Sequence, residues 1–223
     1  MKNEFLLQDL ETAIDLQAFL NRAKRLDPAG LVRLRAYGNL LAAYVAPIFA
    51  GGIMDSGPTV LGLRTSSLQG DAEVEGLVSI QAMLDRLAMV IDQGIWDKRA
   101  SVVSLPPNER AAWAGVLPPR SGWVASGTIS ENELTEIAKA GIDEVADTLP
   151  EAVGGPIAAR IRGEIWGRAI EAHTKVPTGA AFVAAGLGFL TENEQVEIFE
   201  TDGWVRLSSQ HGHVLAKQAK SFV

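Results

Sequence analysis

The chain has 223 residues, of which 27 are acidic, 20 are basic and none is cysteine, and its formal net charge is −7. The lack of cysteine excludes disulfides, thiolate metal sites and cysteine nucleophiles, and it favours a reducing cytoplasm. The negative charge disfavours nucleic acid as a partner. No apolar run reaches the roughly 20 residues that span a bilayer, so we expect a cytoplasmic protein without membrane contact.

The first half of the chain is expected to form a small antiparallel sheet with flanking helices. Apolar residues recur at helical spacing up to Leu26, and Asp27-Pro28 ends the pattern. Two alternating segments then flank Gly38-Asn39, which predicts a hairpin on a two-residue turn. The predicted elements are a helix over residues 10–26, a hairpin over residues 31–45, strands over residues 59–65 and 73–78, and a helix that begins after Ser79.

Between residues 93 and 122 the apolar residues no longer recur at helical or strand spacing. This stretch contains Pro106-Pro107 and Pro118-Pro119, and paired prolines interrupt both helices and strands. This break in the pattern predicts that the chain has three parts. They are an antiparallel sheet plus helices over residues 1–95, a connector over residues 96–122, and a helical half with a terminal hairpin over residues 123–223.

The second half resembles a winged helix in the order of its predicted elements. Its hairpin turns on Asp202-Gly203, a pair that type I′ turns prefer. Ser130 and Glu133 form a capping box, which marks a helix start. The elements are a strand over residues 123–129, helices that begin at Ser130, after Pro156 and at Thr178, a hairpin over residues 195–208, and a strand over residues 214–216. The predicted fold class is therefore α+β, with a winged-helix-like half.

The charges of this half argue against contact with DNA. Its third predicted helix has no charged or amide side chain over residues 178–185 that could reach a base or a phosphate. The hairpin bears several acidic residues against a single basic one, Arg206, so a phosphate backbone would meet net negative charge. A winged-helix-like transcription regulator is therefore the alternative and not the first prediction.

Three arginines form the candidate site for a small anion. Arg33 and Arg35 project from one outer face of the first hairpin, and Arg64 is expected to join them from the next strand. Three guanidiniums on one face could hold a carboxylate or a phosphate by bidentate hydrogen bonds. The alternative partners of these arginines are Asp71, Glu73 and Glu75 for ion pairs and Tyr44 for stacking.

Tryptophan is concentrated in and beside the connector. Trp96, Trp113 and Trp123 are three of the five tryptophans in the chain. They are either core residues or, because tryptophan suits contact surfaces, candidates for a subunit interface or a peptide groove. Since twofold dimers are the commonest soluble oligomers, we predict a homodimer.

Candidate metal ligands and catalytic motifs are sparse. His211 and His213 share one face if their segment is extended, and this spacing can begin a metal site. No third ligand is indicated, so surface histidines are the preferred interpretation and no metal is predicted. The sequence has no GxGxxG, GxxxxGK[ST], HExxH, GxSxG or SxxK motif. We therefore predict no cofactor and no catalytic residue, and an enzyme is disfavoured.

Three segments give the chain a resemblance to known sequences. They are residues 25–35 (RLDPAGLVRLR), residues 117–123 (LPPRSGW), and residues 186–190 (GLGFL) leading into residues 204–207 (WVRL). With these segments the chain resembles a group of uncharacterised actinobacterial proteins of about the same length. The resemblance implies a cytoplasmic bacterial protein whose two halves belong to one unit. It transfers no activity and no catalytic residue.

The sequence thus favours a non-catalytic binding or protein-interaction module that acts as a homodimer. The first alternative is the winged-helix-like transcription regulator. The second is a small-anion-binding protein or an enzyme that uses Arg33, Arg35 and Arg64.

Overall fold

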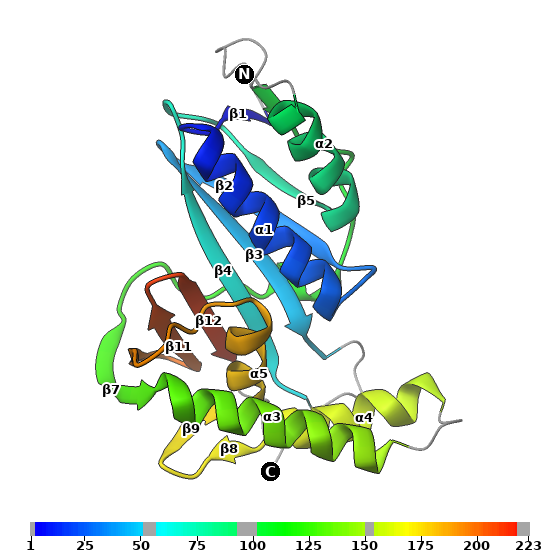
Figure 1. Ribbon diagram of the computed structural model, residues 1–223, viewed down its shortest axis with the longest axis vertical. Coiled ribbons are helices and arrows are strands. Elements are labelled where there is room, and N and C mark those ends of the chain that lie inside the picture. Colours follow the sequence, from blue (N-terminus) through cyan, green and yellow to red (C-terminus); the bar gives the residue numbers. More distant parts are fainter. Residues whose placement is uncertain (1–2, 51–56, 93–101, 150–153, 218–223) are drawn as a thin grey trace. The chain divides into compact units, whose positions relative to one another are not determined.

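Figure 1 shows the computed structural model, which describes residues 3–50, 57–92, 102–149 and 154–217. The chain divides into two compact units. The first comprises Met1–Val45 and Leu63–Ala114, and the second comprises Ala46–Gly62 and Gly115–Val223. The long strands β3 (Leu40–Ile48) and β4 (Thr59–Ser67) each contribute one end to each unit. Among the residues described, every helix is too short or too polar to cross a membrane.

The first unit consists of a sheet and a pair of helices. Its strands neighbour one another in the order β5-β2-β3-β4, and β2 pairs antiparallel with both β3 and β5. Besides the ends of β3 and β4, the elements are β1 (Glu4–Leu6), α1 (Leu10–Leu26), β2 (Leu31–Tyr37), β5 (Glu75–Ser79), α2 (Ile80–Asp92), β6 (Val102–Ser104) and the 3-10 helix η1 (Ala112–Gly115). Figure 1 shows α1 and α2 side by side.

Helix α1 begins and ends where its sequence predicts. The Asp9 carboxylate accepts the backbone N–H of Thr12 at 2.8 Å and the Thr12 hydroxyl at 2.7 Å, and these bonds lower the pKa of Asp9. The helix buries one apolar stripe, which includes Leu16, Phe19 and Leu20. Helix α1 also makes extensive contact with α2.

The register of the first hairpin confirms the prediction from the two-residue turn. Val32 pairs with Val45 and Leu34 with Ala43, and all four side chains are buried. Because strand side chains alternate between faces, the arginines of β2 lie on the opposite face.

The second unit combines its part of the sheet with three helices. Its strands follow the order β4-β12-β11-β10-β7, and β8 and β9 form a separate two-stranded sheet. The elements are β7 (Val124–Ser130), α3 (Glu131–Thr148), α4 (Gly155–Trp166), β8 (Ala169–Ile170), β9 (His173–Pro177), α5 (Thr178–Gly186), β10 (Gln195–Thr201), β11 (Trp204–Ser209) and β12 (Gly212–Lys217). The β8–β9 hairpin was not predicted from the sequence.

The predicted fold class is wrong, because the hairpin β10–β11 is not a wing. It lies within a sheet, with β7 paired antiparallel to β10 on one side and β12 paired antiparallel to β11 on the other. Through β3 and β4 the strands continue in the order β5-β2-β3-β4-β12-β11-β10-β7, so the fold has one eight-stranded sheet with helices. Local periodicity located the strands, but their long-range pairing depends on tertiary structure.

The winged-helix prediction is also wrong for helix α5. It occupies the position of a DNA-reading helix in the predicted order, yet Gly179, Ala181 and Val183 are buried along with most of the helix. It contacts α3 and β12. A helix that is apolar on all sides belongs in a core, so the lack of charge on α5 reflects burial.

Candidate functional site

The three arginines predicted to form an anion site are all ion-paired. Arg33 Nη2 lies 2.6 Å from Glu75 Oε1, and Arg35 Nε lies 2.8 Å from Glu75 Oε2. Arg64 makes a bidentate pair with Asp15 of α1, with N–O distances of 2.8 and 2.5 Å. The structure thus brings Arg33 and Arg35 to one carboxylate and places Arg64 on another.

The candidate interface tryptophans have different surroundings. Trp96 lies outside the described residues. Trp113 is buried in η1, with 4% of its surface exposed. Trp123 is half-buried, and its indole N–H donates to the carbonyl of Pro119 at 3.0 Å. Of the two that are described, Trp123 is therefore the one with a partly open surface.

The guanidinium of Arg206 contacts two aromatic rings in the second unit. Its central carbon lies 4.8 Å from the centre of the Trp123 ring and 4.3 Å from that of Phe199. Arg206 Nε is buried and has no hydrogen-bond partner within the described parts of the chain. Desolvation lowers the pKa of Arg206, and the charge of Glu197 opposes that effect. The ring faces therefore provide the nearest favourable contacts for this charge.

The two histidines named by the sequence do not form a metal centre. His213 Nδ1 lies 3.0 Å from Ser208 Oγ on the neighbouring strand. Burial lowers the pKa of His213, and the charge of Arg206 adds to the effect. Across residues 3–50, 57–92, 102–149 and 154–217, no three His, Asp or Glu side chains are grouped so that they could hold a metal ion.

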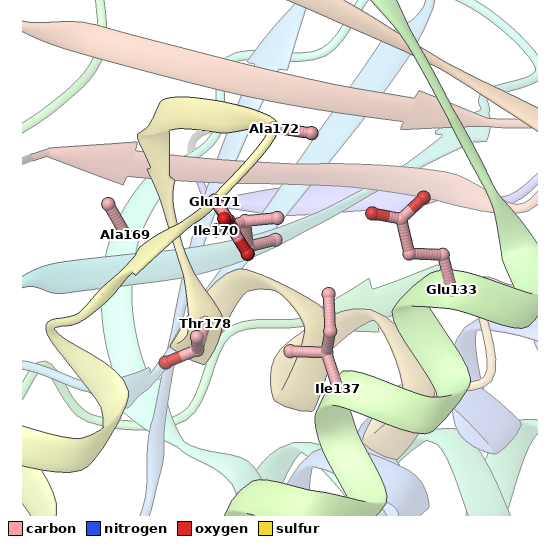
Figure 2. Close-up of a pocket in the computed structure, with 7 residues that line it drawn as sticks. All are labelled: Glu133, Ile137, Ala169, Ile170, Glu171, Ala172 and Thr178. Atoms are coloured by element: carbon pink, nitrogen blue, oxygen red, sulfur yellow. The ribbon is translucent and has the colours of Figure 1, made fainter.

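A cavity of about 590 Å³ lies in the second unit between α3 and the β8–β9 hairpin (Figure 2). Its lining combines apolar side chains with two carboxylates. The lining residues are Glu133, Ile137, Ala169, Ile170, Glu171, Ala172 and Thr178. We call this cavity the acidic groove. A second cavity, of about 550 Å³, lies at the β10–β11 turn, where Lys175 and Glu200 pair with each other.

The helix pair of the first unit bears a group of basic side chains. We call Arg22, Lys24 and Arg25 of α1 the helix-pair patch. Lys24 Nζ donates to Gln81 Oε1, which places the second half of α1 beside the start of α2. Apart from Lys24, the patch is exposed, and its arginines form no ion pair or side-chain hydrogen bond with a described residue.

Sequence reasoning missed both the helix-pair patch and the acidic groove. Arg22 and Arg25 are three residues apart on a correctly predicted helix, so their shared surface could have been found from the spacing. The acidic groove had no comparable signal. Its hairpin was not predicted, and its position beside α3 results from tertiary packing.

Two family models match the chain. The model "Domain of unknown function (DUF8010)" matches residues 1–115, and "Domain of unknown function (DUF8185)" matches residues 118–221. The first covers 115 of the 223 residues, so the chain belongs to the DUF8010 family. No curated protein matches the sequence. The predicted resemblance to proteins without an assigned activity is thereby confirmed.

Several solved structures are similar to this chain at low identity. Caulobacter crescentus pol III beta is 13% identical, with a TM-score of 0.47 over 94% of this chain and 64% of that one. The DNA polymerase III subunit beta from Pseudomonas aeruginosa is 13% identical, with a TM-score of 0.44 over 99% of this chain and 65% of that one. The chain spans just under two thirds of the length of these proteins.

The functional prediction drawn from the sequence requires correction. The comparisons give no support to an interaction module for which nucleic acid is disfavoured, and the similar solved structures carry the titles of DNA polymerase subunits. The winged-helix alternative is wrong because its hairpin and third helix belong to the sheet and the core. The anion-binding alternative is not retained, since all three of its arginines are ion-paired.

Proposed function

We propose that this chain is a nucleic-acid-associated protein that contacts the phosphates of duplex DNA through the helix-pair patch. The observation that carries the proposal is the pair of exposed guanidiniums of Arg22 and Arg25, which have no ion pair within the described residues. Other arginines of the chain, such as Arg33 and Arg168, are paired with carboxylates. An exposed arginine without a carboxylate partner is free to bind a phosphate.

The arrangement of the helix-pair patch suits a phosphate backbone. Arg22 and Arg25 are three residues apart on α1 and therefore lie on neighbouring parts of one helix surface.

The net charge of −7 does not oppose this contact at short range. At physiological ionic strength the Debye length is about 8 Å, so exposed charges farther away are largely screened. Phosphates at the helix-pair patch would respond mainly to the arginines beside them. Binding should consequently be weak at high salt and independent of base sequence, because arginine contacts to phosphates carry no sequence information.

The similar solved structures are titled as DNA polymerase subunits and sliding clamps. The proposal itself rests on the helix-pair patch. The homodimer and the cytoplasmic location remain predictions from the sequence, and light scattering of the purified chain tests the first of them.

Fluorescence anisotropy of a short fluorescein-labelled DNA duplex tests the proposal. The full chain should bind at low salt, and its affinity should fall steeply between about 50 and 200 mM salt. Replacing two phosphate contacts in Arg22→Ala/Arg25→Ala should reduce the slope of log K against log salt by about 1.8.

The matched control is Arg110→Ala/Arg162→Ala, which removes two exposed arginines outside the helix-pair patch and changes the net charge equally. This control should bind like the wild type. Absence of duplex binding at low salt, or equal loss in both double variants, would overturn the proposal.

A further inference from the structure

We propose that the acidic groove is a docking site for an extended peptide that places a lysine or arginine side chain next to apolar ones. This site lies in the second unit and is independent of the proposed contact with DNA. The proposal follows from three properties of the groove: its apolar floor, its two carboxylates and the pairing of nearby basic residues.

The floor of the acidic groove is apolar. Ile170 of β8 is buried, with 4% of its surface exposed, and Ile137 of α3 is half-buried. Figure 2 shows the two isoleucines on opposite sides of the same space, one from the hairpin and one from the helix. The volume of about 590 Å³ falls within the range of ligand-binding cavities. Apolar side chains of a partner can therefore be buried here.

Glu133 provides the first carboxylate, and it does not complete the predicted capping box. Ser130 Oγ accepts the backbone N–H of Glu133 at 3.2 Å, which caps α3. No return bond from the Glu133 carboxylate occurs among the described residues, and the side chain is exposed. Figure 2 shows this carboxylate pointing from α3 into the space that faces the hairpin.

Glu171 provides the second carboxylate, from the turn of the β8–β9 hairpin. It too is exposed and has no ion pair within the described parts of the chain. The arginine and the lysine nearest to it in sequence pair with other acids. Arg168 makes a bidentate pair with Glu144 at 2.7 Å for each bond, and Lys175 pairs with Glu200. The two groove carboxylates therefore have no ion-pair partner within the described parts of the chain.

Charge and shape together select the occupant. Phosphates are repelled by Glu133 and Glu171, so the acidic groove does not suit nucleic acid. A small hydrated cation would gain nothing from the isoleucines. Lysine and arginine combine a cationic head with an apolar stem, so they can cover an apolar floor while pairing with carboxylates at its border. Neighbouring apolar residues of the same peptide would fill the remaining volume.

The test uses the full chain and a fluorescein-labelled peptide of alternating lysine and leucine, with a glutamate and leucine peptide for comparison. Anisotropy at low salt should show binding of the lysine peptide and none of the glutamate peptide. The variant Glu133→Gln/Glu171→Gln should lower the affinity about tenfold, since it removes both charges without removing the side-chain bulk. Circular dichroism checks that each variant is folded.

The control is Glu109→Gln/Glu192→Gln, which removes two exposed carboxylates elsewhere and produces the same net charge. It should retain wild-type affinity for the lysine peptide. Nuclear magnetic resonance of the wild type should show the largest amide shifts at residues 133–137 and 169–172. Equal loss of affinity in the control, absence of lysine-peptide binding, or shifts centred elsewhere would overturn the assignment.

Discussion

Gly141 of α3 lies against the indole ring of Trp166 of α4, so closely that a Cβ at position 141 would clash with Trp166 Cζ3. The same indole is stacked on Phe182 of α5, with ring centres 4.6 Å apart and an interplanar angle of 25°. These contacts join the three helices of the second unit. A glycine within a helix ordinarily costs stability, but here its lack of a side chain makes room for the ring.

Replacement of Gly141 by alanine should therefore destabilise the chain despite the higher helix propensity of alanine. Overpacking of a buried site costs about 1–3 kcal/mol, which exceeds the propensity gain of about 1 kcal/mol. Urea denaturation of Gly141→Ala measures the difference in free energy of unfolding. Gly155→Ala is the control, because a Cβ there would meet no atom within 4 Å. A Gly141→Ala variant as stable as the wild type would show that Trp166 can move aside.

Glu75 forms ion pairs with two arginines, so its replacement should lower the free energy of unfolding more than replacement of an unpaired acid. Glu75→Ala leaves Arg33 and Arg35 beside each other without a carboxylate, and we expect a loss of about 1 kcal/mol at low salt. The loss should shrink in high salt, because the pair is partly exposed. Glu109→Ala, at an exposed position, should change the free energy of unfolding very little. Equal effects of the two substitutions would contradict a stabilising role for the shared carboxylate.

Trp123 contributes both a ring face to Arg206 and an indole N–H to Pro119. Trp123→Ala removes both contacts and should destabilise the chain by about 1–2 kcal/mol. Trp123→Phe keeps a ring face but loses the N–H donor, so its loss should be smaller. The free energies of unfolding of the two variants separate the contributions. If phenylalanine were as damaging as alanine, the hydrogen bond and not the guanidinium contact would dominate.

His213 should make the stability of the chain depend on pH. Burial lowers its pKa below the ordinary value of 6.5. As the pH falls below that value, the unfolded state binds a proton that the folded state excludes, so stability is lost. His213→Asn cannot take up that proton, and its amide can still reach Ser208. Denaturation at about pH 7.5 and about pH 5.5 should show a smaller drop for the variant than for the wild type. An unchanged drop would assign the pH dependence to other groups.

Several local features could be predicted from the sequence because short-range rules determine them. The turn at Gly38-Asn39 and the alternation around it predicted the register in which Val32 faces Val45. The turn at Asp202-Gly203 likewise predicted the hairpin in which Ile198 pairs with Leu207, both of them buried. In both hairpins the partner strands are close in sequence, so turn length and period determine the pairing.

The sites could be predicted only in part. The spacing of Arg33 and Arg35 correctly placed them on one face, but their shared partner depended on the pairing of β2 with β5. The acidic groove needs Glu133 and Glu171, which are 38 positions apart (171 minus 133), on two elements that meet through packing. No periodicity in the sequence links residues at that separation.

The charged residues that first disfavoured nucleic acid also show which properties follow from sequence and which follow from tertiary structure. By itself the sequence determined the net charge, the helix that carries Arg22 and Arg25, and the apolar character of α5. Tertiary structure decided that α5 is buried and that β7 and β12 enclose the hairpin β10–β11 within a sheet. It also decided which charges are paired and which remain free. Hydrogen bonds and ion pairs act over a few ångströms in space, and such proximity is set by the fold.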